Sequence, residues 1–345
     1  MRRLIVLLAL LLVTGCGDTT TLPEQDLVVR GDAAVTANPT PEETPARGRG
    51  LRIASARIAV VSHGQASDSF WAIVKKGVLD AGRRNSVAVS YRAPETYDID
   101  RMRQLIDEAI SARLDGLVVS LPDVDGLAPA IRRAVKAGIP VVSINSGSDR
   151  FRELGILAHV GQPEYRAGLE AGKRMARRGV RDLLCVNQEV GNAGLDARCR
   201  GIAVAMRGVG GRSRELAVDL QDPEQSQRRI AQAVTQGDID GILTLGPNGA
   251  GPALAAVSAS GLRSRVKLAT FDLSPEVLTA VRDGQLLFAV DQQPYLQGYL
   301  PIALLAERAR HLLMPARGEL IPTGPQFVTR ANAARVLALS RRGFR

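Results

Sequence analysis

The sequence predicts an α/β protein in which two lobes are each built on a parallel β-sheet. From residue 57 onward, short β-branched apolar runs recur, and a segment with helical periodicity separates most neighbouring runs. The runs are almost continuously apolar, as expected for strands that helices cover on both faces. With 345 residues, the chain is also long enough for two domains of ordinary size.

Ten apolar runs are expected to form strands, about five in each lobe, because a single ten-stranded sheet is unusual. They alternate with helical segments such as 70–84, 100–113 and 127–137, and this alternation is typical of βαβ units. The predicted strands cover residues 56–62, 86–91, 115–121, 139–145, 156–161, 182–187, 214–220, 240–246, 266–272 and 286–291.

The amino terminus is predicted to be an export signal. Arg2 and Arg3 precede the apolar run 4–13, which is too short to span a bilayer and fits a signal-peptide core. Small residues then lead directly into Cys16, and this arrangement resembles the bacterial lipoprotein signal. The resemblance implies that residues 1–15 are removed and that Cys16 is lipidated. A plain secretory signal with a chance cysteine is the alternative.

Residues 16–56 are predicted to be a disordered tether. The segment has no periodic apolar pattern and is rich in Thr, Glu and Pro, so it cannot bury enough apolar surface to fold. The folded body is therefore expected to begin near residue 57 and to lie outside the cytoplasm. A membrane contact is expected only through the lipid anchor, in the periplasm or on the outer face of the plasma membrane.

Charge and composition argue against several classes of protein. The formal charge is +10, but the cations are spread along the chain and only 3% of residues are aromatic, so a nucleic-acid groove is not expected. Three cysteines and three histidines, without zinc-site spacing, predict no metal site. The glycine-rich segment 168–173 is too short between its glycines for a phosphate-binding loop, and no nucleophile elbow occurs. No enzyme activity or cofactor is expected.

The ends of the predicted strands indicate a binding site. Ligands of open α/β sheets lie beyond the carboxyl ends of the strands. These ends are rich in amides, hydroxyls and carboxylates, as in 62–65, 187–189 and 246–248. Phe70 and Trp71 are adjacent at the start of the first predicted helix, and aromatic faces stack on the C–H faces of sugar rings. The sequence therefore predicts a neutral, polyhydroxylated ligand between the lobes.

The segment from about residue 57 to 312 resembles the periplasmic sugar-binding proteins of the ribose type. The resemblance implies two Rossmann-like lobes joined by a hinge of three strands, with crossings near 159–162, near 288–292 and beyond 312. One lobe would hold 57–160 plus 290–315, and the other 161–289 plus 316–345. The strings that carry the resemblance are SDSFWAIVKKGVLDAG (67–82), RLDGLVVSLPD (113–123), KAGIPVVSIN (136–145), HVGQPEYRAG (159–168), NAGLDARCRG (192–201), LATFDLSP (268–275) and VRDGQLLFAVDQQPYLQGY (281–299).

The resemblance also implies a function and a ligand set. The chain would capture a monosaccharide or sugar alcohol and deliver it to the permease and ATPase subunits of an ABC importer, acting as a monomer. Asn145 and Ser146 replace the family's acidic residue and arginine, and Gly246 replaces an amide, which argues against ribose itself. The implied ligand-binding residues are Asp68, Phe70, Trp71, Asn145, Arg198, Asn248, Asp272 and Gln292.

Other roles remain open for some of these residues. Asn145 and Asp272 could instead cap helices, Arg198 could pair with a helix carboxylate, and Gln292 could satisfy the backbone of the hinge. Cys185 lies in the middle of a predicted strand and is expected to be a buried thiol, with a bond to Cys199 as the alternative.

Alternative functions also share this architecture. A sensory receptor that signals to a membrane kinase or chemoreceptor would have the same fold, and a lipoprotein that binds a nucleoside or signal molecule could use the same polar cleft. A sugar-responsive repressor is disfavoured because residues 1–56 hold an export signal in place of a DNA-binding helix-turn-helix.

Overall fold

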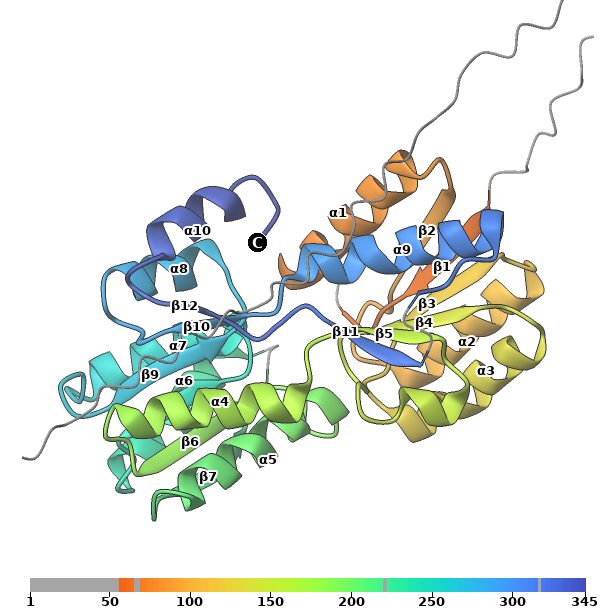
Figure 1. Cartoon of the computed structure of the whole chain (residues 1–345). Coiled ribbons are helices and arrows are strands. Elements are labelled where there is room, and N and C mark those ends of the chain that lie inside the picture. Colours follow the sequence, from red (N-terminus) through yellow and green to blue (C-terminus); the bar gives the residue numbers. More distant parts are fainter. Residues whose placement is uncertain (1–55, 65–68, 220–221, 316–317) are drawn as a thin grey trace, which may run out of the picture. The chain divides into compact units, whose positions relative to one another are not determined.

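The computed structural model describes residues 56–64, 69–219, 222–315 and 318–345. The predicted signal peptide, Cys16, the tether up to residue 55 and Asp68 lie outside these described residues. Within them, no helix combines the length and apolar character needed to cross a bilayer. The fold class is confirmed, because the described residues form two lobes that each contain a mostly parallel six-stranded sheet (Figure 1).

The first sheet is parallel throughout and has the strand order β11-β5-β4-β3-β1-β2. Helices α1 and α9 pack against each other on one face, and α2 and α3 cover the other (Figure 1). The strands of this sheet are β1 (Arg57–Val61), β2 (Ala88–Arg92), β3 (Gly116–Ser120), β4 (Val141–Ile144), β5 (Ala158–Gly161) and β11 (Glu319–Pro322). Its helices are α1 (Ser69–Arg84), α2 (Ile99–Ser111), α3 (Val124–Lys136), α9 (Pro294–His311) and the short η1 (Phe151–Leu154).

The second sheet has the order β12-β10-β9-β8-β6-β7, and only β12 is antiparallel to its neighbour. Helices α4 and α5 cover one face, and α6, α7, α8 and α10 cover the other. The strands are β6 (Asp182–Asn187), β7 (Arg212–Ala217), β8 (Gly241–Thr244), β9 (Lys267–Phe271), β10 (Ala289–Asp291) and β12 (Gln326–Val328). The helices are α4 (Glu164–Arg177), α5 (Ala193–Arg207), α6 (Pro223–Thr235), α7 (Pro247–Ala259), α8 (Pro275–Arg282) and α10 (Ala333–Ser340).

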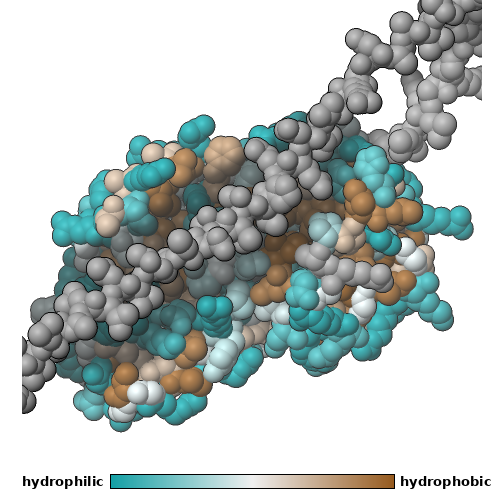
Figure 2. Space-filling view, viewed as in Figure 1, coloured by the Kyte–Doolittle hydropathy of each residue, from teal (hydrophilic) through white to brown (hydrophobic). Residues whose placement is uncertain are grey.

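Alternation along each strand explains why both faces of the sheets are covered. In β1, Ile58 and Val60 pack under α1 and α9, whereas Ala59 and Val61 pack under α2 and α3. Successive side chains point to opposite faces, so a wholly apolar strand needs helices on both sides. The outward sides of the helices are polar, and hydrophilic residues cover much of the face shown in Figure 2, with apolar residues in smaller groups.

The structure adds two strands that the sequence pattern does not predict. β11 has four residues, and β12 has only three, and neither forms a continuous buried run. β11 pairs with β5 of the first sheet, although residues 316–345 were all expected in the second lobe. The strand is half-exposed and ends at Pro322, so its composition does not reveal which sheet it joins.

Three segments of chain connect the two sheets, between β5 and α4, between β10 and α9, and between β11 and β12 (Figure 1). They are hydrogen-bonded to one another. The Thr323 N–H donates to the Gly161 carbonyl at 2.9 Å, and the Gln297 side-chain amide donates to Thr323 Oγ1 at 3.2 Å. The crossings therefore lie side by side and bring the carboxyl ends of both sheets toward one place.

Glycines in α4 allow α5 to approach it closely. A Cβ atom on Gly168 would lie 2.1 Å from the Arg198 carbonyl oxygen, and one on Gly172 would lie 2.7 Å from Ala205 Cβ. The glycine-rich segment 168–173 is thus part of a helix–helix contact inside the second lobe. Because the contact fixes the backbone at Arg198, it also determines where the Arg198 side chain begins.

A disulfide joins Cys185 of β6 to Cys199 of α5, with their Cα atoms 6.0 Å apart. The expectation of a buried free thiol at Cys185 is therefore wrong, and the alternative holds. Both side chains are buried in the core between α4, α5 and the sheet. Helix α5 follows β6 directly and lies on the face to which Cys185 points, so the two sulfur atoms meet.

Candidate ligand-binding site

A polar pocket lies at the carboxyl ends of both sheets. It includes about 470 Å³ of space outside the atoms, counting open solvent at its mouth. Side chains of both lobes line it, as expected for a ligand site at this edge of open α/β sheets. The lining residues are His63, Phe70, Trp71, Asn145, Gln188, Glu189, Leu195, Arg198, Leu245, Gly246, Pro247, Asn248, Asp272 and Gln292.

The first lobe contributes an aromatic wall. Phe70 and Trp71 lie in the first turn of α1, with ring centroids 5.1 Å apart in an edge-to-face arrangement. The Trp71 ring also meets His63 edge-on at 4.8 Å. Gly64 makes this packing possible, because a Cβ atom there would lie 1.8 Å from the indole. The wall offers an apolar surface against which a ring could lie.

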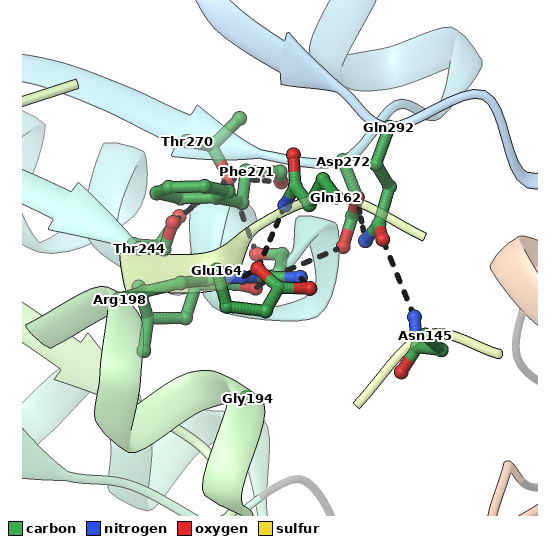
Figure 3. A network of polar contacts seen from close by, with 12 residues as sticks. Asn145, Gln162, Glu164, Gly194, Arg198, Thr244, Thr270, Phe271, Asp272 and Gln292 are labelled. Atoms are coloured by element: carbon green, nitrogen blue, oxygen red, sulfur yellow. Dashed lines mark hydrogen bonds and ion pairs between the residues drawn. The ribbon is translucent and has the colours of Figure 1, made fainter. Parts of the chain in front are cut away.

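Asn145 follows β4 and reaches the hinge. Its backbone has φ of 63°, and its Nδ2 donates to Oε1 of Gln292 at 3.3 Å and to Oε1 of Gln297 at 3.4 Å. Ser146 Oγ donates to Asn145 Oδ1 at 3.1 Å. Asn145 caps no helix, since η1 begins after Arg150. These contacts hold an amide from the first lobe against the hinge (Figure 3).

Arg198 is the one cationic side chain among the described pocket residues, and it is only 2% exposed. Glu164 receives two hydrogen bonds from it, at 2.5 Å from Nε and 3.0 Å from Nη2 (Figure 3). Its Nη1 donates to the Leu245 carbonyl at 3.1 Å and lies 3.8 Å from Asp272 Oδ2. Burial acts to lower the pKa of Arg198, but Glu164 and Asp272 outweigh it and the pKa is raised.

Arg198 pairs with a carboxylate, which was the alternative to ligand contact, and it also lines the pocket. Glu164 is itself buried and also accepts a hydrogen bond from Gln162 Nε2 at 2.8 Å. A planar guanidinium held on one side by a carboxylate keeps its remaining N–H groups in fixed directions. Arg198 is therefore pre-oriented before any ligand arrives.

Asp272 follows β9 with φ of 62° and faces the hinge. Its Oδ1 accepts a hydrogen bond from Gln292 Nε2 at 2.7 Å (Figure 3). The helix-cap role is excluded for Asp272, because Ser274 caps α8 through a hydrogen bond from the Val277 N–H at 3.1 Å. Asp272 thus stands between Arg198 and the hinge, with a carboxylate at the pocket wall.

A second polar corner joins the lobes at His63, Asn192 and Glu189. The Asn192 amide orientation is fixed, because its Oδ1 accepts from the Gly194 N–H at 3.0 Å. Its Nδ2 therefore donates, to Glu189 Oε2 at 2.7 Å and toward His63 Nε2 at 3.3 Å. His63 Nε2 must then carry a lone pair, so the ring proton lies on Nδ1, 2.8 Å from Ser120 Oγ.

Burial determines the protonation of this corner. Burial, with a smaller effect from Arg198, lowers the pKa of His63 to about 3, so the ring is neutral near pH 7. Burial also raises the pKa of Glu189, against the opposing effects of Asn192 and Arg198. The corner therefore brings a neutral imidazole and a poorly solvated carboxyl group together at the junction of the lobes.

The structure brings together seven of the eight residues predicted to bind a ligand, namely Phe70, Trp71, Asn145, Arg198, Asn248, Asp272 and Gln292. Asp68 lies outside the described residues. Sequence reasoning missed His63, Gln188 and Glu189 as pocket residues, and Glu164 as the partner of Arg198. The signal for the first three was present, since each follows a strand, β1 or β6, at its carboxyl end.

The chemistry of the described site suits binding. Among the residues that the structure describes, no three His, Cys, Asp or Glu side chains come together as metal ligands. Both donors and acceptors line the pocket, since the Arg198 guanidinium and the Asn145 amide carry N–H groups and Asp272 is an acceptor. Such a lining can hydrogen-bond several hydroxyl groups of one small molecule while the aromatic wall covers its apolar face.

Residues 58–311 match the family described as "Periplasmic binding protein domain". The chain belongs to this family. Periplasmic binding proteins bind solutes and are not enzymes, which confirms the expectation of a non-catalytic protein. The match extends from β1 to the last turn of α9, and so includes every described pocket residue.

Among the solved structures, this periplasmic binding protein is similar to a carbohydrate transporter from Acidothermus cellulolyticus in complex with myo-inositol. The two are 37% identical with a TM-score of 0.79, over 84% of this chain and 100% of that chain. A solute-binding protein of an ABC transporter from Burkholderia graminis, in complex with D-arabinose, is 21% identical with a TM-score of 0.72, over 80% and 96% of the two chains. That second likeness shows the fold alone.

A curated relative is the xylose/arabinose-binding protein XylF from Sulfolobus acidocaldarius. It is 26% identical to this chain over 305 residues, which are 83% of this chain and 74% of the relative.

Proposed function

We propose that the protein captures a small neutral carbohydrate, a monosaccharide or sugar alcohol, in its pocket and delivers it to an ABC importer. The observation that carries this proposal is the combination of an aromatic wall with hydrogen-bonding groups from both lobes. Phe70 and Trp71 can cover a ring face, while Arg198, Asn145 and Asp272 can bind the hydroxyl groups at its edge. A ligand held by both lobes stabilises the arrangement in which they meet.

The charge of the site supports a ligand without negative charge. The Arg198 guanidinium is already paired with Glu164, so it donates hydrogen bonds without requiring an anion. Asp272 adds a carboxylate that accepts from hydroxyl groups and repels phosphate or carboxylate groups. Hydrogen bonds to charged partners contribute about 1.5–3 kcal/mol each, enough to hold a small polyol tightly.

The comparisons favour cyclic polyols and pentoses as the first ligands to test. The relative from Acidothermus cellulolyticus, which holds myo-inositol, is the more similar of the two solved structures described above, and the curated relative is a xylose/arabinose-binding protein. The substitutions at Asn145, Ser146 and Gly246 argue against ribose itself. We therefore expect a sugar alcohol such as myo-inositol, or a pentose or hexose other than ribose.

Isothermal titration calorimetry tests this function. The purified protein is titrated with myo-inositol, D-xylose, L-arabinose, D-ribose and a sugar phosphate. We expect one neutral compound to bind. In urea denaturation, the same compound at a hundred times its dissociation constant should raise the free energy of unfolding by about 2.7 kcal/mol. If the sugar phosphate binds far more tightly than every neutral compound, or if no carbohydrate binds, the proposal fails.

The proposal includes a place for the protein outside the cytoplasm. The family is one of extracytoplasmic binding proteins, and the sequence of residues 1–16 supports a lipid anchor at Cys16. The segment up to residue 56 would then be the tether between this anchor and the folded body. The permease and ATPase subunits of the importer would be separate chains.

A further inference from the structure

Beside the second polar corner, Glu189 and Gln188 each have a hydrogen-bond acceptor that no described residue satisfies. Both contacts of the Glu189 carboxylate, with Asn192 at 2.7 Å and with His63 at 3.9 Å, use Oε2, so Oε1 has no partner among the described residues. The Gln188 Oε1 atom is buried and also has no partner there. Both side chains line the pocket, so a ligand could satisfy them.

The charges around the pocket are unbalanced. Arg198 is the one cation among the described lining residues, and Glu164 already pairs with it at 2.5 Å. Asp272 pairs with the same guanidinium at 3.8 Å, and Glu189 adds a third carboxylate near this single cation. His63 cannot supply the missing positive charge, since its Nε2 accepts from Asn192 and the ring is neutral. Among the described residues, the corner around Glu189 thus has no cation of its own and feels only the more distant Arg198.

We propose that Glu189 selects for a ligand in which an ammonium group replaces one ring hydroxyl, that is, an amino sugar or aminocyclitol. This inference rests on the carbohydrate-binding part of the proposed function and concerns the same pocket, but it gives the preferred ligand one positive charge in place of none. A hydroxyl has one proton to donate, whereas an ammonium group has three N–H bonds and a positive charge. It can therefore donate to Glu189 Oε1, retain N–H bonds for other acceptors of the corner, and offset the charge of the Glu189 carboxylate.

The electrostatic environment supports the same assignment. Burial raises the pKa of Glu189, which means that the ionised carboxylate is poorly solvated in the ligand-free protein. A bound ammonium group would restore the interactions that the carboxylate loses on burial. With only 23% of its side chain exposed, Glu189 is shielded enough for such a contact to retain most of its strength. Hydrogen bonds between charged groups predict a preference of about ten- to a hundred-fold over the hydroxyl compound.

The test compares scyllo-inositol with scyllo-inosamine by calorimetry at neutral pH. The six hydroxyl groups of scyllo-inositol are equivalent. The amino group of scyllo-inosamine can therefore take the position next to Glu189 without any change in how the ring binds. The pairs D-glucose and D-glucosamine, and D-galactose and D-galactosamine, are measured in the same way. We expect the amino compound to bind at least ten-fold more tightly than its parent in one pair. Equal or weaker binding of the amino compound in every pair overturns the proposal.

Three variants test whether Glu189 causes the preference for the amino compound over its parent. In Glu189→Gln the amino compound and its parent should bind equally, because the shape is kept and the charge is lost. Glu224→Gln, a matched change at an 88% exposed residue of the same lobe, should keep the wild-type ratio. Asp272→Asn should weaken both ligands and leave a preference for the amino compound. A ratio that survives in Glu189→Gln, or is lost only in Asp272→Asn, overturns the role of Glu189.

The failure of the inference and the failure of the proposed function give different results. If the neutral compounds bind and the amino compounds have no advantage, only the role of Glu189 is wrong. If neither the neutral nor the amino compounds bind, the carbohydrate-binding function is wrong and the inference falls with it.

Discussion

Gln292 donates a hydrogen bond from Nε2 to Oδ1 of Asp272 over 2.7 Å, and so connects a hinge crossing to the pocket wall. The Oε1 of the same side chain accepts from Asn145 at 3.3 Å and from Gln297 at 2.9 Å. One amide thus contacts the first lobe, the second lobe and the hinge (Figure 3). A change in the position of either lobe must alter at least one of these hydrogen bonds.

Asp272→Ala is expected to weaken carbohydrate binding by about ten- to several-hundred-fold, because the ligand loses a charged acceptor. Calorimetry with the best neutral ligand measures the effect, and Asp272→Asn distinguishes loss of charge from loss of contact. Asp283→Ala, at an exposed residue that pairs with Arg282 after α8, is the control and should bind as the wild type does. Wild-type affinity in Asp272→Ala would remove Asp272 from the site.

Glu164→Gln is expected to lower the free energy of unfolding by about 3 kcal/mol, because it removes the nearer of the two carboxylates that pair with the buried Arg198. The side chains of Glu164 and Arg198 are each only 2% exposed. Urea denaturation measures the change. Asp107→Asn, which breaks an exposed pair with Arg133, is the matched control and should cost much less. Equal effects of the two variants would show that the buried pair contributes no more to the free energy of unfolding than the exposed pair does.

Removal of the disulfide should lower the free energy of unfolding by about 3 kcal/mol, the value expected for a closed loop of about this length. The two cysteines are 14 residues apart in the sequence. The measurement is a thermal melt of wild type and of the double variant Cys185→Ala and Cys199→Ala, each with and without reductant. Reductant should destabilise only the wild type. If it leaves the wild-type midpoint unchanged, the bond does not form in solution.

His63 should make the protein less stable in acid. Its pKa is about 3 when folded and near 6.5 when exposed, so between these values the unfolded chain binds a proton that the folded protein excludes. The free energy of unfolding therefore falls as pH is lowered through this window, by up to about 1.4 kcal/mol per pH unit. His159, with a pKa also lowered to about 3 by burial, acts in the same direction.

Urea denaturation at a series of pH values between 7 and 4, roughly the upper part of that window, measures the effect. The slope of stability against pH should be shallower in His63→Gln than in the wild type. Parallel slopes for the two proteins would mean that His63 titrates alike in the folded and unfolded states.

Cys16→Ser should release the protein from the membrane while the folded body stays intact. The reason is that a thioether-linked lipid needs the cysteine sulfur, which serine lacks. Partition of cell extracts between detergent and water measures the anchor, and thermal melts of both proteins serve as the control for folding. Identical partition of wild type and variant would contradict the lipoprotein interpretation.

The sequence was sufficient to predict the architecture where patterns are local and strong. A continuous apolar strand such as β3, which is buried along its whole length, can be recognised from its own residues. β11 and β12 cannot, because strands of three or four half-exposed residues gain their stability from a neighbour and carry no periodicity of their own. The sequence therefore predicted the parallel sheets, including the edge strands β2 and β7, and missed the opposite edge strand of each sheet.

The candidate site was predictable only in part, for the same physical reason. Strand ends point to the pocket, and seven of the residues chosen there line it. The network that orients them depends on contacts between distant segments. Arg198 meets Glu164 only because glycines bring α4 and α5 together, and His63 meets Asn192 across 129 positions of sequence. The bond between Cys185 and Cys199 likewise depends on the distance between their Cα atoms, which the sequence pattern does not reveal.

The order in which the chain is made has a consequence for β11. This strand forms the edge of the first sheet beside β5, yet it follows almost the whole second lobe in sequence. During translation, β5 keeps an open hydrogen-bonding edge until Glu319–Pro322 leaves the ribosome, and β10 waits still longer for β12. Neither sheet can therefore be completed until nearly the whole chain has been synthesised, so both lobes reach their final hydrogen bonding late and almost together.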